Sequence, residues 1–385
     1  MTNDAPSVKE AKQVPDTISP ETHARQRQLL EELSNAFGPT GHEGPVRAIV
    51  RRELTPLVDD VETDGIGSVI ARIGDETEGV PRIMIAGHMD EVGLMVRQIT
   101  AEGYLTIQTL GGWLDQSLIN QRWVVMTRNG PIPGLTGIKT VHVMQPDART
   151  QVFKKENMFI DVGAKNKEDA EQRLGIRPGD PVAPDSRFQE MAGGELYLGK
   201  AWDDRAGVAG LIEIARAIRE SADPLPATVY LVATVQEEVG LRGAHTSSFH
   251  VMPDIGLNLE SGVAGDYPGI TKDEAQEELG KGPTVFLHDS SMIPNLRLRD
   301  FIVDTAADLE MPLQFNVLSG YGEDGAEMQK AGSGAPSINI AIPTRYLHSH
   351  NGIIHRDDFA NAVRLVTAVL HRLTPDAVTN LTTFD

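Results

Sequence analysis

Five polar clusters in this sequence have the residue types that hold metal ions and move protons. Each lies just past an apolar run or at a glycine-flanked break. The sequence has no cysteine, so the candidate ligands are imidazoles and carboxylates, which favour zinc, cobalt, manganese or magnesium. The clusters are His88 with Asp90, Asp203 with Asp204, Glu237 with Glu238, Glu260, and His348.

Four of these clusters directly follow apolar segments that are typical of buried strands. The segments are 82–86, 227–235, 255–259 and 338–342. In an open α/β sheet, ligands bind outside the carboxyl ends of the strands. Groups that are far apart in the sequence are therefore expected to meet at one edge of a sheet.

Charge counting indicates what such a site would bind. His88 and His348 supply two imidazoles, and Asp203, Glu238 and Glu260 supply three carboxylates. Two divalent ions would carry roughly four positive charges, which exceed the three negative ones, and the surplus would lower the pKa of a water held between the ions. A carboxylate can bridge two metals through its two oxygens, and Asp203 is the candidate for this bridge.

Two further carboxylates have expected roles that do not require metal contact. In the pair Glu237 and Glu238, one side chain can bind metal while its neighbour acts as a general base. Asp90 lies two residues from His88 on an extended segment, so both side chains share a face. Asp90 is therefore expected to orient the His88 ring.

Each cluster taken alone also has a plainer explanation. His88 with Asp90 suits a hydrogen-bonded turn, and Asp203 with Asp204 suits a helix N-cap. The other carboxylates suit a solvated loop or a turn, and His348 competes with neighbouring histidines. Together, however, the clusters would place several like charges in one cleft with nothing to neutralise them. The neighbouring histidines, expected to be structural or supporting, are His350 and His355.

The periodicity of apolar residues predicts an α/β protein with a second, β-rich part. Helices are expected over 20–37, from near Pro45, and over 167–174, 206–219, 294–308 and 357–372. Further strands are expected over 67–73, 93–99, 104–110 and 123–127, whereas 129–134 reads as a turn.

The pattern of strands and turns predicted from the sequence changes near Val92 and changes back after residue 190. Between these points, short strands alternate with glycine and proline. We therefore expect a small β-rich domain, 93–190, inserted into a catalytic domain formed by 21–92 and 191–385. Residues 1–20 are polar and acidic and read as a disordered leader.

Composition excludes several classes of function. The net charge of −20 argues against binding nucleic acid or an anionic membrane. No apolar run approaches the roughly 20 residues that span a bilayer, and no targeting segment is present, so a cytoplasmic location is expected. Phosphate-binding glycine loops, a Gly-x-Ser-x-Gly elbow and a His-Glu-x-x-His motif are absent from the sequence.

Several ordered motifs resemble those of the tetrahedral (TET) and glutamyl aminopeptidases, which are dinuclear metallo-aminopeptidases of the zinc-aminopeptidase clan. The resemblance runs from about residue 25 to residue 375 and includes the expected insertion. The motifs lie at 86–93, 200–207, 234–244, 264–269 and 343–349.

The resemblance implies a mixed central sheet flanked by helices and interrupted by a small β-barrel dimerisation domain. It implies His88, Asp203 and Glu260 on one metal, and Asp203, Glu238 and His348 on the other. It also implies Glu237 as the general base and a cis peptide bond after Asp203. The substrates would be peptides with a free N-terminus, and the metals Zn²⁺ or Co²⁺, with Mn²⁺ as a further option.

The resemblance further implies a homo-oligomer built from dimers, such as a tetrahedral dodecamer. Two positions depart from the family pattern: Glu260 stands where aspartate is more usual, and 322–325 reads Gly-Glu-Asp-Gly where the family often has Gly-Thr-Asp-Ala. Some relatives carry endoglucanase or deblocking labels. Two alternatives therefore stay open: the same metal site acting on N-acyl amides or glycans, and a non-catalytic assembly protein that keeps the fold.

Overall fold

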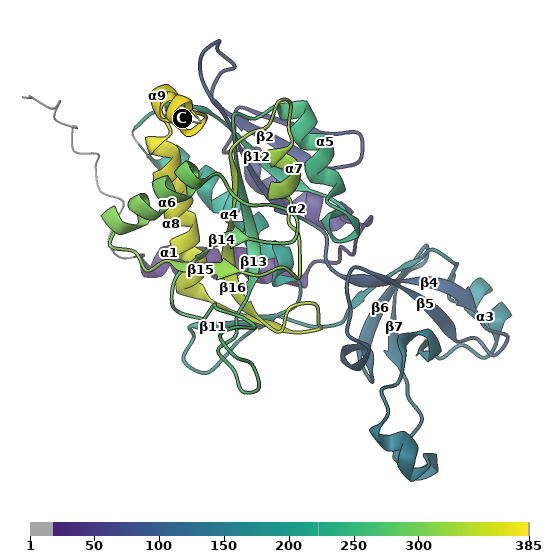
Figure 1. Ribbon diagram of the computed structural model, residues 1–385. Helices are drawn as coiled ribbons and strands as arrows, with labels where there is room; N and C mark the ends of the chain where they lie inside the picture. The colour runs from purple at the N-terminus through teal and green to yellow at the C-terminus, as the bar shows by residue number, and fades with distance from the viewer. Residues whose placement is uncertain (1–17, 222, 384–385) are drawn as a thin grey trace, which may run out of the picture.

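The computed structural model describes residues 18–221 and 223–383. It consists of a large α/β body and a smaller barrel attached to one side of it (Figure 1). Residues 1–17 of the expected leader lie outside the described residues. The first helix, α1, begins at Pro20, and its N-cap is Ser19, whose hydroxyl accepts a hydrogen bond from the backbone N–H of Thr22.

An eleven-stranded mixed sheet forms the centre of the large body. Its middle strands follow the order β12-β3-β13-β16, and these four run parallel to one another. All seven residues of β12 are buried, as expected for a strand covered on both faces. The strands are β1 (Asp60–Thr63), β2 (Val69–Ile73), β3 (Arg82–His88), β10 (Gln189–Glu190), β11 (Leu196–Gly199), β12 (Thr228–Thr234), β13 (Ile255–Val263), β14 (Thr284–His288), β15 (Gln314–Val317), β16 (Ser337–Arg345) and β17 (Gly352–His355).

Helices cover both faces of this sheet. On one face, α4 contacts β3 and β13 and packs against α1, α2 and α8, while α6 packs on α8; on the other, α5 and α7 pack together. Successive side chains of β3 point to opposite faces of the sheet. Ile83 and Ile85 therefore belong to the larger hydrophobic core, and Met84 belongs to the smaller one. The helices are α1 (Pro20–Asn35), α2 (Gly44–Leu54), α4 (Trp202–Glu220), α5 (Arg242–Val251), α6 (Leu296–Asp308), α7 (Gly325–Gln329), α8 (Arg356–Arg372) and α9 (Pro375–Leu381).

The smaller body is a closed barrel in the order β4-β5-β8-β7-β6-β9. It has its own hydrophobic core, which includes Leu94, Trp123 and Val182. The short helix α3 (Lys167–Gln172) lies beside it. The barrel strands are β4 (Gly93–Ile99), β5 (Leu105–Leu110), β6 (Arg122–Thr127), β7 (Gly130–Thr136), β8 (Phe159–Asp161) and β9 (Pro181–Pro184).

The expected fold class, a helix-flanked mixed sheet with a small inserted β-barrel, is confirmed. Two local predictions were wrong. Residues 129–134 are mostly strand β7 rather than a turn, and Pro131 and Pro133 pair with β6. On its other side, β7 pairs with β8 only through Leu135 and Thr136. The prolines therefore lie in a part of β7 that has a partner strand on one side only, where proline is tolerated.

The second wrong prediction concerns the end of the strand expected at residue 259. Strand β13 continues to Val263, so Glu260 lies inside a strand and not in a turn after it. Its neighbour β16 stays paired with it from Gly256 to Val263, and this pairing outweighs the local Ser-Gly turn signal. Within the described residues, no helix is long and apolar enough to cross a membrane.

Candidate metal centre

The sheet brings the sequence-predicted polar residues to one edge, at the carboxyl ends of its four parallel strands. His88 ends β3, and Glu237 and Glu238 form a short 3-10 turn directly after β12. Glu260 lies within β13, and His348 follows β16. The convergence expected from the sequence is therefore present in the fold.

Asp203 reaches the same point from the start of α4. The backbone is left-handed at Ala201, and Asp203 and Asp204 do not have helical dihedral angles. The peptide bond between Asp203 and Asp204 is cis, as the family resemblance implies. Asp204 turns back toward the sheet, where its carboxylate accepts the backbone N–H of His88 at 3.1 Å, and Asp203 is left facing the histidines.

The side chains form two groups that share Asp203. In the first group, His88 Nε2 lies 2.9 Å from Asp203 Oδ1 and 3.7 Å from Glu260 Oε1. In the second, His348 Nε2 lies 3.2 Å from Asp203 Oδ2 and 3.7 Å from Glu238 Oε2. Each oxygen of Asp203 therefore faces a different group.

The tautomer of each histidine follows from its second ring nitrogen. His88 Nδ1 lies 3.0 Å from the backbone oxygen of Asp90, and His348 Nδ1 lies 2.8 Å from that of Gly112. A carbonyl oxygen only accepts hydrogen bonds, so Nδ1 carries the proton in both rings. Nε2 is then free to bind a cation.

The loop after β5 brings the barrel to this centre. Gly111 has φ +77°, and a Cβ atom there would lie 2.7 Å from Glu238 Oε2. Glycine is needed at this position because the backbone is left-handed and the approach is close. The next residue, Gly112, supplies the carbonyl that holds His348, and sequence analysis did not identify either glycine.

Asp90 lies near His88 and also binds the backbone of the Glu237–Glu238 turn. Its carboxylate accepts the backbone N–H groups of Glu237 at 3.0 Å and Glu238 at 3.3 Å, and the hydroxyl of Thr40 at 2.9 Å. The distance from Asp90 Oδ1 to His88 Nδ1 is longer, 3.6 Å. The carboxylate thus fixes the Glu237–Glu238 turn, while the backbone oxygen of the same residue orients the imidazole.

Burial dominates the electrostatics of this cluster. It raises the pKa of Glu238 to about 8 and that of Glu260 to about 7. For His348, burial lowers the pKa, but the hydrogen bond to Asp203 and the charge of Glu238 outweigh it and raise the pKa to about 9. Carboxylates packed in this way need positive charge to stay ionised.

The donor set fits two divalent cations. Two Nε2 atoms and three carboxylates are arranged in two groups whose ligand atoms lie within 4.8 Å of one another. Within the described chain, Glu238 Oε1 is buried without a hydrogen-bond partner. His88, Asp203 and Glu260 could hold one ion, and Asp203, Glu238 and His348 could hold the other.

A cavity of about 450 Å³ opens beside the centre. Asp203, Glu237, Glu238 and His348 line it together with Glu323, and apolar side chains including Leu241, Val263 and Leu347 complete the wall. Sequence reasoning noted the unusual 322–325 segment but assigned Glu323 no role.

Neither His350 nor His355 belongs to the two groups. The ring of His350 packs against Trp123, with centroids 4.3 Å apart, and its Nε2 donates to the backbone oxygen of Arg122 at 3.2 Å. His355 caps α8 by accepting the N–H of Asp357. Both are structural in this fold.

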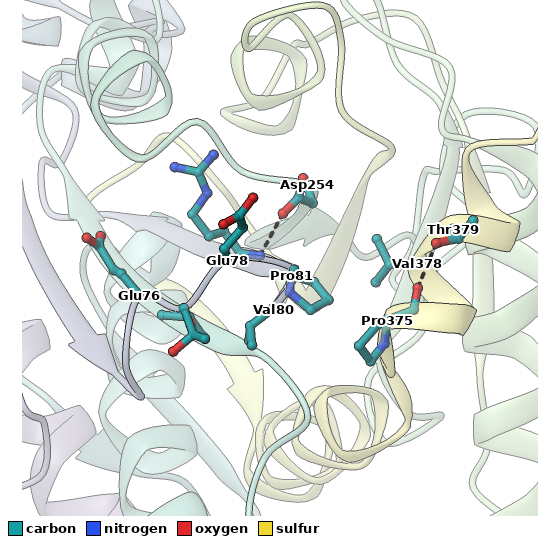
Figure 2. Close-up of a pocket in the computed structure, with 12 residues that line it drawn as sticks. Glu76, Glu78, Val80, Pro81, Asp254, Pro375, Val378 and Thr379 are labelled. Carbon is teal, nitrogen blue, oxygen red and sulfur yellow. Dashed lines mark hydrogen bonds between the residues drawn. The ribbon is translucent and has the colours of Figure 1, made fainter.

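A second cavity, of about 500 Å³, lies at the opposite end of β3 and β12. Val80, Pro81 and Asp254 face Pro375 and Val378 of α9 across it (Figure 2). It contains none of the residues predicted from the sequence. The functional cavity is therefore identified by its chemistry.

Comparisons with known proteins agree on one family. A family model described as M42 glutamyl aminopeptidase matches residues 67–365. A putative aminopeptidase, FrvX, of Escherichia coli is 36% identical and is matched over 93% of this chain and 98% of its own length. A glutamyl aminopeptidase of Lactococcus lactis is 32% identical, with coverage of 91% and 98%.

Solved structures give the same result. A TET aminopeptidase from a marine sediment archaeon, Thaumarchaeota archaeon SCGC AB-539-E09, has a TM-score of 0.90 and 43% identity, with 93% of this chain and 99% of that chain covered. The Pyrococcus horikoshii TET1 peptidase, described as assembling into a tetrahedron or a large octahedral shell, has a TM-score of 0.79 and 28% identity, with coverage of 90% and 100%.

Proposed function

The chain belongs to the M42 glutamyl aminopeptidase family and is a metal-dependent aminopeptidase, and from this premise we propose how its residues divide the reaction. His88, Asp203 and Glu260 hold one divalent ion, and Asp203, Glu238 and His348 hold the second. The observation that carries this proposal is the shared carboxylate of Asp203, whose oxygens lie 2.9 Å from His88 and 3.2 Å from His348.

When bound, the two ions would polarise the scissile carbonyl and make a water between them more acidic. Glu237 belongs to neither group of ligands, and its Oε2 lies 3.8 Å from His88 Nε2 at the cavity wall. Glu237 therefore accepts the proton of the attacking water and passes it to the leaving amine. Asp90 keeps Glu237 in place through its backbone N–H.

The substrates in this proposal are peptides with a free N-terminus, and the metals are Zn²⁺ or Co²⁺, with Mn²⁺ as a further option. The domains are 21–92 with 191–385, and 93–190, supported by their separate hydrophobic cores. We propose that 93–190 forms a dimer and that dimers build a larger homo-oligomer, in keeping with the assemblies described for the Pyrococcus horikoshii peptidase. The cytoplasmic location stays a prediction.

Glu237→Gln tests the role of the general base. The amide keeps the size of the side chain but cannot take up the proton, so kcat should fall by about 100- to 10,000-fold. Both metals should remain bound, because Glu237 is not a ligand. Glu327→Gln, on the nearby helix α7, is the matched control. Near-normal turnover of Glu237→Gln with both metals present would overturn the assignment.

Substrate choice separates the proposal from its alternatives. A free aminoacyl anilide should be cleaved at least about tenfold faster than its N-acetylated form, because an aminopeptidase binds the free N-terminus. Preference for the blocked anilide, or for a glycan, would favour the alternative substrates. A purified protein that binds no Zn²⁺, Co²⁺ or Mn²⁺ and shows no activity with any of them would favour the assembly protein.

A further inference from the structure

One carboxyl group at the metal centre has no part in the proposed ligand set. Glu323 lies in the loop before α7, lines the cavity beside Asp203 and Glu237, and is 7% exposed. Its carboxyl group is a neighbour of that of Glu260. A buried carboxyl group beside a candidate metal ligand in a cavity is a candidate for a functional role.

The loop holds Glu323 from both sides. The hydroxyl and the backbone N–H of Ser290 both donate to the carbonyl of Tyr321, and Thr234 donates to the carboxylate of Asp324 at 2.5 Å. Glu323 O accepts the N–H of Ala326 at 2.9 Å. The backbone around Glu323 is thus held in place, and its side chain lines the cavity.

The described residues that line the cavity around Glu323 include no permanently charged cation. The charged groups that act on it are Glu260, Glu237 and Asp203, all of them carboxylates, and neither lysine nor arginine is among the described residues that line the cavity. Two divalent ions would bring roughly four positive charges against the five carboxyl groups of Asp203, Glu237, Glu238, Glu260 and Glu323. One negative charge is left for a cationic ligand.

The distance of a substrate's amino group from the scissile carbonyl decides whether that group can reach Glu323. The α-nitrogen of a peptide lies about 2.5 Å from the carbonyl carbon of the same residue, because only two bonds separate them. If the carbonyl of the substrate's first residue lies between the two groups of candidate ligands, the α-nitrogen of that residue must lie close to the same ligands. Glu323 is also there, beside Glu260. The amine of a lysine side chain would lie about 6 Å further along the chain.

We propose that Glu323 binds the α-ammonium group of the substrate and so fixes the N-terminal residue at the metal centre. This proposal rests on the proposed function and deepens it, because it names the residue that makes cleavage depend on a free N-terminus. Glu323 is a specificity residue that contacts the substrate and is separate from the ligands of the metals.

The test compares Glu323→Gln with the wild type and with Glu327→Gln, a change of the same kind outside the cavity. The binding probes are leucinol, which has the free ammonium group, and 4-methylpentan-1-ol, which lacks it, added to zinc-loaded protein. Calorimetry should show at least a tenfold loss of leucinol affinity in Glu323→Gln, with no change for the alcohol. Zinc content should stay equal to that of the wild type.

Kinetics with leucyl-p-nitroanilide should show a rise in KM of at least tenfold with a smaller change in kcat. Glu323→Asp, which keeps the charge on a shorter side chain, should recover part of the leucinol affinity. Loss of zinc from Glu323→Gln would make Glu323 a ligand and overturn the proposal, as would unchanged leucinol binding. A wild-type enzyme that cleaves N-acetylleucyl-p-nitroanilide as fast as the free form would instead refute the proposed function.

Discussion

Glu277 is a fully buried carboxyl group outside both groups of candidate metal ligands. Asn316 donates one N–H to its Oε1, and the same amide donates to the hydroxyl of Tyr321 at 3.0 Å, at the cavity wall. Within the described chain, Oε2 of Glu277 has no partner. Burial raises the pKa of Glu277 from 4.5 to about 7, against the opposing hydrogen bond from Asn316.

This raised pKa predicts a specific pH dependence of stability. The folded protein binds the Glu277 proton more tightly than the unfolded chain, so the stabilisation is complete below pH 4.5 and is lost as the pH rises through about 7. The loss amounts to about 3 kcal/mol. Glu277→Gln removes this titration. The free energy of unfolding of the variant, measured by urea unfolding, should therefore rise relative to that of the wild type when the pH is changed from 5 to 8.

Glu102→Gln, at an exposed hairpin position, is the control and should follow the wild type at both pH values. Parallel stability curves for the wild type and Glu277→Gln would contradict the prediction. Glu277 was invisible to sequence reasoning, because nothing in its neighbours indicates that a carboxylate at that position is buried.

The metal-ligand candidates, in contrast, could be found from the sequence. His88, Glu237 and Glu238 lie at or just after the ends of apolar strands, and that position alone places them at the carboxyl edge of a parallel sheet. Glu323 and Gly112 come from irregular loops whose course depends on tertiary packing. The contact of Asp90 with Glu237 also requires that β3 and β12 be neighbours, which periodicity does not reveal.

At the scale of elements, one buried ionic network ties α1, α4 and the segment after β3 together. Lys200 Nζ lies 2.6 and 2.7 Å from the two oxygens of Glu91. Arg205 contacts Glu91 at 3.3 Å and donates to the backbone oxygens of Leu33 and Met89. The start of α4, which carries Asp203, is thereby fixed relative to the end of β3, which carries His88.

Arg205→Met should therefore destabilise the protein by about 3–5 kcal/mol, because it leaves buried carbonyls and part of the charge of Glu91 without a partner. Arg52→Met, which breaks the exposed pair with Glu32, should cost less than about 1 kcal/mol. Chemical unfolding of both variants measures the difference. Equal losses would mean that the buried network does not hold these elements together.

Element boundaries show where local sequence signals fail. The glycine and proline residues of 130–134 indicate a turn, yet barrel closure makes the segment a strand that leaves the prolines on an unpaired side. Strand β13 continues through Ser261 and Gly262 because it pairs with β16 along eight residues. In both cases partners distant in the sequence override local preference.

At the scale of the whole molecule, the segment between β7 and β8 projects from the barrel away from the α/β body (Figure 1). Its three valine side chains are exposed: Val141 by 52%, Val143 by 59% and Val152 by 44%. A projecting segment with solvent-exposed valines favours contact with another protein surface. The proposed homo-oligomer supplies such a surface.

The combined change Val141→Ser, Val143→Ser and Val152→Ser should therefore reduce the mass of the assembly, measured by analytical ultracentrifugation. Metal content and the urea midpoint should change little, because the barrel core does not include these valines. Phe249→Ser, which removes an apolar side chain that is 78% exposed on α5, is the control and should leave the mass unchanged. An unchanged mass for the triple variant would place the contacts between subunits elsewhere. A smaller assembly that keeps both metals and its activity per site would separate assembly from catalysis, because the ligand groups come from a single chain.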